Sequence, residues 1–109
     1  MNDESALASL SALAQGHRLA TFRRLVRAGE RGMSAGAIAQ ALAMAPSSLS
    51  FHLAQLSEAG LVTQERQHRT IIYRANYPAV HALVGYLLEN CCEVDGCGAA
   101  ALEALEQAS

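Results

Sequence analysis

Apolar residues recur at helical spacing along most of this chain, and the pattern predicts a mainly α-helical protein. Four helices are expected in the first half of the sequence, at residues 3–15, 17–28, 34–42 and 46–58. A last helix is expected to begin near Tyr77 and to reach Asn90, with a short further helix within residues 98–109. The last long helix has the most regular apolar stripe, formed by Val80, Leu83, Val84, Leu87 and Leu88.

The spacing of the third and fourth helices is that of a helix-turn-helix. Ser34 suits the N-cap of the third helix, and Pro46 stands in the first turn of the fourth, where proline is favoured. Only residues 43–45 separate the two helices. Residues 61–67 and 70–75 then read as two strands of a hairpin with a basic tip. The expected fold is therefore mainly α with a small β-hairpin.

The chain has 109 residues, which is the length of one domain, and we expect a single domain spanning residues 1–109. Charge is distributed unevenly along it. The net charge is −2, yet every basic residue is an arginine, and all eight lie between Arg18 and Arg74. That segment contains only three glutamates and has a balance of +5. A basic middle between acidic ends is typical of a nucleic-acid-binding face.

The sequence shows neither a signal peptide nor an apolar run of the roughly 20 residues that a membrane span needs. Its three cysteines are an odd number. We therefore expect a cytoplasmic protein with reduced thiols and no membrane partner.

All three cysteines fall within seven residues, at Cys91, Cys92 and Cys97, and Gly96 allows the chain to turn between them. Three thiolates suit a soft, thiophilic ion. Redox chemistry and simple packing of small apolar side chains are the alternatives. The pattern alone leaves the identity of the ion open.

The stretch of residues 44–56, with its Ser50-x-His52-Leu53 element, followed by Ala59-Gly60-Leu61-Val62, closely resembles the ArsR/SmtB family. The likeness covers roughly residues 14–88. It implies a winged helix-turn-helix repressor that senses metals or metalloids and binds double-stranded operator DNA as a homodimer. In that family the first and last helices form the dimer interface. The resemblance therefore implies that the apolar residues of these helices lie at the interface, namely Leu7, Leu10, Leu83 and Leu87.

The chain lacks two ligand motifs of the family, and their absence reduces the number of ions expected to act as inducer. Residues 33–37 lack the Cys-Val-Cys motif of many arsenic-responsive members, and most of the ligands of zinc-responsive members are missing around His81. The remaining candidate ligands are Cys91, Cys92 and Cys97, which look like those of the subgroup that binds trivalent arsenic at the end of its last helix. As(III) or Sb(III) is thus the expected inducer, and zinc ranks second because it prefers four ligands. No organic cofactor is expected.

The expected DNA contacts come from the fourth helix and the hairpin tip. On a helical wheel, the side opposite Leu49, Leu53 and Leu56 holds Ser47, Ser48, Phe51, Ala54 and Gln55. Short hydroxyls and an amide can bond to base edges or phosphates in the major groove. The family resemblance adds Ser50. His52 lies on the flank, where it can reach DNA or pack at a boundary under the hairpin. Arg66 and Arg69 at the hairpin tip suit phosphates or the minor groove.

The leading interpretation is a dimeric repressor released from its operator by trivalent arsenic or antimony. A redox-sensing or zinc-responsive repressor of the same fold is the alternative, and an interaction module that has lost DNA binding is a further one. A thiol enzyme is remote, because the sequence has no Cys-x-x-Cys pair, no nucleotide-binding loop and no general base near the thiols.

Overall fold

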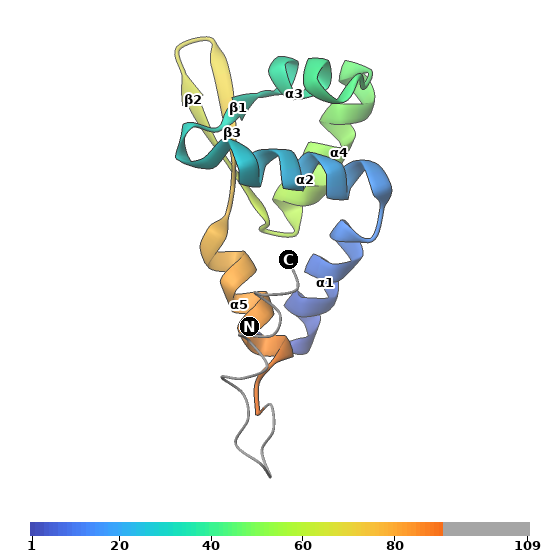
Figure 1. Cartoon of the computed structure of the whole chain (residues 1–109), viewed down its shortest axis with the longest axis vertical. Coiled ribbons are helices and arrows are strands. Elements are labelled where there is room, and N and C mark those ends of the chain that lie inside the picture. The colour runs from blue at the N-terminus through green and yellow to red at the C-terminus, as the bar shows by residue number, and fades with distance from the viewer. Residues whose placement is uncertain (91–109) are drawn as a thin grey trace.

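The computed structural model describes residues 1–90, which form five α-helices, one turn of 3-10 helix and a three-stranded antiparallel sheet (Figure 1). In chain order the elements are α1 (Asp3–Leu13), α2 (Gly16–Ala28), η1 (Gly29–Arg31), β1 (Met33–Ser34), α3 (Ala35–Leu42), α4 (Pro46–Glu58), β2 (Val62–Gln67), β3 (Thr70–Ala75) and α5 (Tyr77–Leu87). The order matches the sequence-based expectation apart from η1 and β1. Within these 90 residues, no helix is long and apolar enough to cross a membrane.

Side-chain caps define where several helices begin. The Asn2 side chain accepts the backbone N–H of Ser5 at the start of α1, and Ser34 accepts that of Ala37 at the start of α3, as predicted. Such caps satisfy backbone donors that have no partner inside the helix. Helix α4 has no side-chain cap, but Pro46 occupies its first turn, where the missing N–H costs nothing.

The hydrophobic core lies where α4 packs against α2 and α3. Leu49, Leu53 and Leu56 of α4 are at most 1% exposed and pack in one cluster with Leu25 of α2 and Ile38 of α3. Full burial of one leucine side chain stabilises a fold by about 1.5–3 kcal/mol, so this face fixes α4 firmly in the domain. The apolar face predicted for α4 is confirmed.

The sheet has strand order β1-β3-β2, with every neighbouring pair antiparallel. β2 and β3 form the predicted hairpin, with Val62 opposite Ala75 and Gln67 opposite Thr70. The short strand β1, which places Met33 opposite Tyr73, was missed because two residues are too few to show an alternating pattern. It ties the start of α3 to the hairpin. The winged helix-turn-helix is thereby complete.

Helices α1 and α5 contact each other at the end of the molecule away from α3 and the hairpin (Figure 1). The sequence-based boundary of the last helix was wrong, since α5 ends at Leu87 and does not reach Asn90. Asn90 has a positive φ of 62°, a conformation that asparagine tolerates better than most residues and that does not continue a helix. The further helix expected within residues 98–109 lies outside the described residues.

Gly29 begins η1 and Gly32 follows it, and together they allow a test of how β1 is held against β3. Gly29 and Gly32 have φ values of 68° and 67° with extended ψ, a region almost restricted to glycine. A Cβ at Gly32 would lie 2.6 Å from the carbonyl oxygen of Tyr73, whereas a Cβ at Gly29 meets nothing within 4 Å.

Both Gly29→Ala and Gly32→Ala should lower the free energy of unfolding by about 1–3 kcal/mol through backbone strain. Gly32→Ala should lower it by about 1–3 kcal/mol more, because the methyl group forces β1 away from β3. Urea denaturation of both variants measures the difference. Equal destabilisation would show that contact with Tyr73 does not restrict this position.

Candidate nucleic-acid interface

Helix α4 is held by its apolar face and presents the opposite face to solvent. Ser47, Ser48, Ser50, Phe51 and Ala54 are all exposed on it. Phe51 is 58% exposed, although large aromatic side chains are usually buried for most of their surface. Serine hydroxyls can bond to base edges or phosphates, and an aromatic ring can contact a thymine methyl group. This face can therefore enter a major groove.

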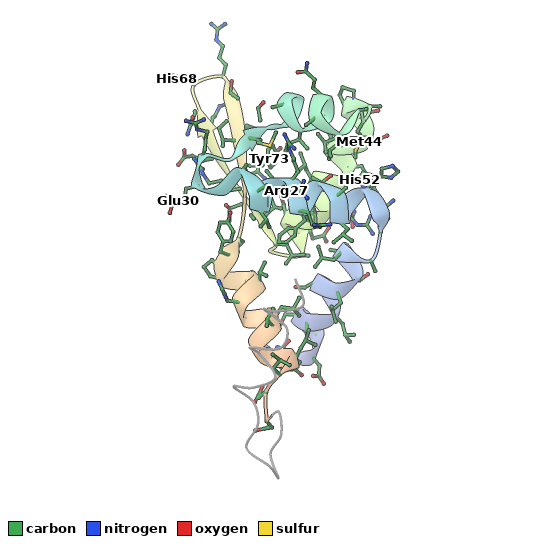
Figure 2. The ribbon with its side chains drawn as sticks, viewed as in Figure 1. Arg27, Glu30, Met44, His52, His68 and Tyr73 are labelled. Carbon is green, nitrogen blue, oxygen red and sulfur yellow. The ribbon has the colours of Figure 1, made fainter. Side chains whose placement is uncertain are left out.

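His52 lies on the flank of α4, where it packs against α2 (Figure 2). Its ring stacks on that of His17, with centroids 5.5 Å apart and planes 22° apart. The Nδ1 atom of His52 is buried and has no hydrogen-bond partner among residues 1–90. Burial lowers the pKa of His52, and the nearby His17 and Arg18 lower it further. The ring packs against α2 and not under the hairpin.

Gln55 is only half-buried, but its surroundings differ from those of the serines. Together with Arg18 and Glu58 it lines a hollow between α4 and α1. The helical wheel placed Gln55 beside Ser47, whereas the structure places it on the side of α4 that faces α1. Its DNA contact stays a prediction.

The wing, formed by β2 and β3, carries the two arginines predicted to contact DNA. Its tip is a tight turn at His68 and Arg69, where His68 has a positive φ of 58° (Figure 2). Arg66 donates from Nε to the backbone oxygen of His68 at 3.3 Å, so its side chain lies along the tip. Both Arg66 and Arg69 are exposed and available to phosphates.

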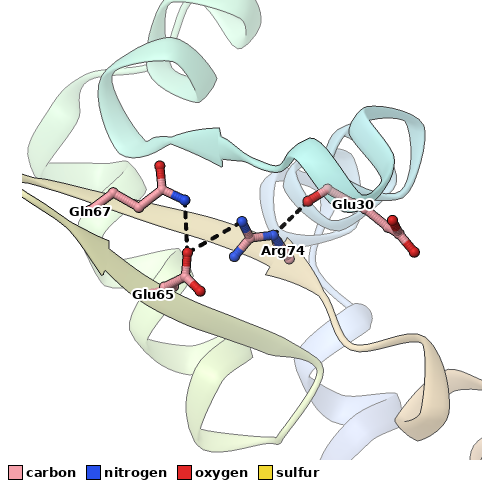
Figure 3. Close-up of polar contacts among 4 residues, drawn as sticks. All are labelled: Glu30, Glu65, Gln67 and Arg74. Carbon is pink, nitrogen blue, oxygen red and sulfur yellow. Dashed lines mark hydrogen bonds and ion pairs between the residues drawn. The ribbon is translucent and has the colours of Figure 1, made fainter.

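Arg74 at the base of the wing is a structural residue (Figure 3). Its Nε donates to the backbone oxygen of Glu30 at 2.6 Å, and its guanidinium lies 3.6 Å from the Glu65 carboxylate. The Gln67 side chain also donates to Glu65, at 2.7 Å. These two neighbours, Gln67 first and then Arg74, lower the pKa of Glu65. Arg74 thus links the wing to η1.

Arg18 also has a structural contact. Its Nε donates to the backbone oxygen of Ala12 at 2.7 Å and thereby joins the start of α2 to the end of α1. The stacking partner of His52 was missed by sequence reasoning, because His17 has no local motif and the contact joins residues far apart in the chain.

The residues predicted for the dimer interface differ in exposure within the single chain. Leu7 is 66% exposed, Leu10 40% and Leu87 56%, while Leu83 is 5% exposed and packs within its own chain. The exposed three border a hollow of about 280 Å³ between α1 and α5. A continuous apolar surface on two adjacent helices is typical of an interaction site.

Cys91, Cys92 and Cys97 lie outside the described residues. Within residues 1–90 there is no group of three or more His, Cys, Asp or Glu residues placed to hold a metal ion.

Comparisons with known proteins agree with this geometry. Residues 13–65 match the family model described as a helix-turn-helix domain. The chain is 32% identical over 84 residues to the HTH-type transcriptional regulator YgaV of Escherichia coli, a match that covers 77% of this chain and 83% of YgaV.

Solved structures support the fold. An ArsR-like transcriptional regulator from Rhodococcus sp. RHA1 superposes with a TM-score of 0.74 at 24% identity, covering 97% of this chain and 93% of that one. The homodimeric winged helix-turn-helix domain of Mb0332 from Mycobacterium bovis, a possible ArsR-family regulator, has a TM-score of 0.65 at 26% identity and covers 83% and 89% of the two chains. The chain belongs to the ArsR family of winged helix-turn-helix transcriptional regulators.

Proposed function

We propose that this regulator is a dimeric repressor that leaves its operator when trivalent arsenic or antimony binds the thiolates of Cys91, Cys92 and Cys97. The observation that carries the proposal is the presence of all three cysteines within seven residues and of none elsewhere. Soft thiolate ligands select soft ions, and three of them match the three-coordinate pyramid of trivalent arsenic. Zinc prefers a tetrahedron of four ligands.

The broader role follows from family membership. ArsR-family proteins are DNA-binding transcriptional regulators, so the expectation that the chain is not an enzyme is confirmed. For DNA binding, the exposed serines and Phe51 of α4 can contact base edges, and the positively charged side chains of Arg66 and Arg69 can bind the phosphates of the DNA.

The dimer is supported by the apolar surface that α1 and α5 leave exposed. Leu7, Leu10 and Leu87 are all at least 40% exposed in the single chain, and a second copy can cover them. A homodimeric relative has the same fold. Two recognition helices in a dimer read half-sites about one turn of DNA apart, so the dimer geometry controls operator affinity.

The proposed switch acts through α5. Only three residues separate Leu87, the last residue of α5, from Cys91. Bringing three sulfurs to one ion constrains the chain directly after α5, and α5 contacts α1. A constraint there changes the dimer surface and with it the spacing of the two α4 helices. Typical allosteric couplings of about 1–3 kcal/mol reduce affinity by about 5–150-fold.

The first prediction concerns the wing. In the double variant Arg66→Ala/Arg69→Ala, the dependence of log K on log salt concentration should flatten by about 0.9 for each phosphate that the wing no longer neutralises. Sequence preference should change little, because interactions with phosphates carry no base information. Fluorescence anisotropy with a labelled operator fragment at several salt concentrations measures the slope.

The matched control removes two arginines from the exposed face of α2, as Arg23→Ala/Arg24→Ala, and should leave the slope close to that of the parent. Equal flattening in both double variants would mean that only total charge matters, and would remove the wing from the interface.

The second prediction concerns assembly. Leu87→Glu should yield monomers, because Leu87 is 56% exposed in the single chain and a charge there disrupts an apolar interface without entering the core. Phe51→Glu is the control, since Phe51 is 58% exposed on α4 and should stay dimeric while losing DNA binding. Sedimentation velocity separates the two species. A dimeric Leu87→Glu would place the interface elsewhere.

The third prediction concerns induction. Each of Cys91→Ser, Cys92→Ser and Cys97→Ser should fold and bind operator like the parent, but should resist release by arsenite, because two thiolates leave an open, weaker chelate. Anisotropy of the protein–operator complex during an arsenite titration gives the response. Zinc is the control ion and should release little DNA.

Full arsenite response in all three single variants contradicts a three-thiolate site. If the variants lose their response to peroxide and keep that to arsenite, the thiols form a redox sensor.

A further inference from the structure

A hollow of about 310 Å³ lies between α1, the start of α2 and the second half of α4. Its walls consist of small, polar and charged residues, namely Ala8, Ser11, Ala12, Arg18, Gln55, Glu58 and Ala59. Ser47 and Phe51, on the exposed face of α4, are not among them. A volume of this size accommodates a small molecule.

Arg18 presents a fixed positive charge to this hollow. Its Nε is occupied by the backbone oxygen of Ala12 at 2.7 Å, and the side chain is partly buried. The two terminal nitrogens of the guanidinium are left for another partner, and they form a fork that matches a carboxylate. Arg18 has no carboxylate partner among residues 1–90, where the ion pair within 4.0 Å joins Arg74 and Glu65.

Glu58 presents a negative charge to the same hollow from α4 and likewise has no ion-pair partner in that part of the chain. Gln55 and Ser11 add an amide and a hydroxyl. Three alanines in the wall leave the space between the two charges open.

We propose that this hollow binds a small zwitterion, with its carboxylate on Arg18 and its ammonium group on Glu58. Because Arg18 and Glu58 carry opposite charges on one hollow, the two residues together favour a ligand with one negative and one positive group. A simple anion that binds Arg18 also meets the repulsion of Glu58, and a simple cation that binds Glu58 meets that of Arg18. Only a ligand that carries both charges gains from both residues.

The proposed zwitterion site shares no residue with the proposed thiol site. Its walls come from α1, α2 and the recognition helix α4, so a bound zwitterion fixes α4 relative to α1.

The test is an NMR titration of the full chain with ω-amino acids of increasing length, from glycine to 6-aminohexanoate. The amide signals of Ser11, Gln55 and Glu58 should shift saturably at millimolar concentrations, and affinity should peak at one chain length. Acetate and butylamine should bind more weakly than the best ω-amino acid. No saturable shift with any length, or equal affinity for acetate and butylamine, would overturn the proposal.

The ring signals of His52 give an independent readout. Arg18 is among the groups that lower the pKa of His52, with burial and His17 as the others. A carboxylate on Arg18 offsets that charge, so the pKa of His52 should rise when the ω-amino acid binds. An unchanged pKa at saturation would place the ligand away from Arg18 and contradict the site.

Three variants test whether the ligand binds through the charge of Glu58 and whether it lies in the hollow. Glu58→Gln should weaken binding of the best ω-amino acid by about two- to fivefold, the range for an exposed ion pair, and should not weaken acetate binding. Glu30→Gln is the matched control, because Glu30 is exposed and does not line the hollow. Ala8→Leu should abolish binding by filling the space. Equal effects of Glu58→Gln and Glu30→Gln, or unimpaired binding by Ala8→Leu, would refute the assignment.

Discussion

Burial of one face of α4 is the constraint on which the rest of the structure depends. Leu49, Leu53 and Leu56 are essentially inaccessible to solvent, and replacing a buried leucine with alanine typically costs about 2–5 kcal/mol. Because these residues lie on one side of the helix, they fix its rotation as well as its position. The serines and Phe51 on the opposite side are therefore exposed as a direct result of core packing.

Core packing and a few hydrogen bonds together connect the recognition helix to the rest of the domain. α2 packs against α4 through Leu25, and Arg18 at the start of α2 bonds to the end of α1. On the other side, Arg74 joins the wing to η1, and β1 joins the wing to α3. A displacement of α1 or α5 can thus reach α4 through packed side chains and hydrogen bonds, which is the physical requirement for the proposed switch.

Helices with strong apolar periodicity were predictable from sequence, because three or four turns carry enough positions to define a face. The cap at Ser34 and the start of α4 at Pro46 were predictable because both residues act locally, and the hairpin was predictable because it joins two neighbouring segments of the chain. β1 was not, because its two residues are defined only by pairing with β3. Periodicity also cannot distinguish burial within a chain from burial between chains. Leu83 and Leu87 share one stripe, yet Leu83 is 5% and Leu87 56% exposed in the single chain, and the interface role of both stays a prediction.

The candidate site was only partly predictable. The wheel identified the exposed face of α4, but it could not reveal that Gln55 borders a hollow formed with α1. It also could not reveal that His52 stacks on His17. Both features depend on how α1 and α2 pack against α4, and a local sequence pattern does not predict the packing of helices that are distant in the chain.

The most direct test of the account is a single titration of the parent protein, bound to labelled operator DNA, with arsenite. Operator release and the number of free thiols are followed together in the same samples. The account predicts that three thiols per chain are consumed for each arsenic bound and that the operator is released over the same range. DNA that stays bound after the thiols are saturated would contradict it.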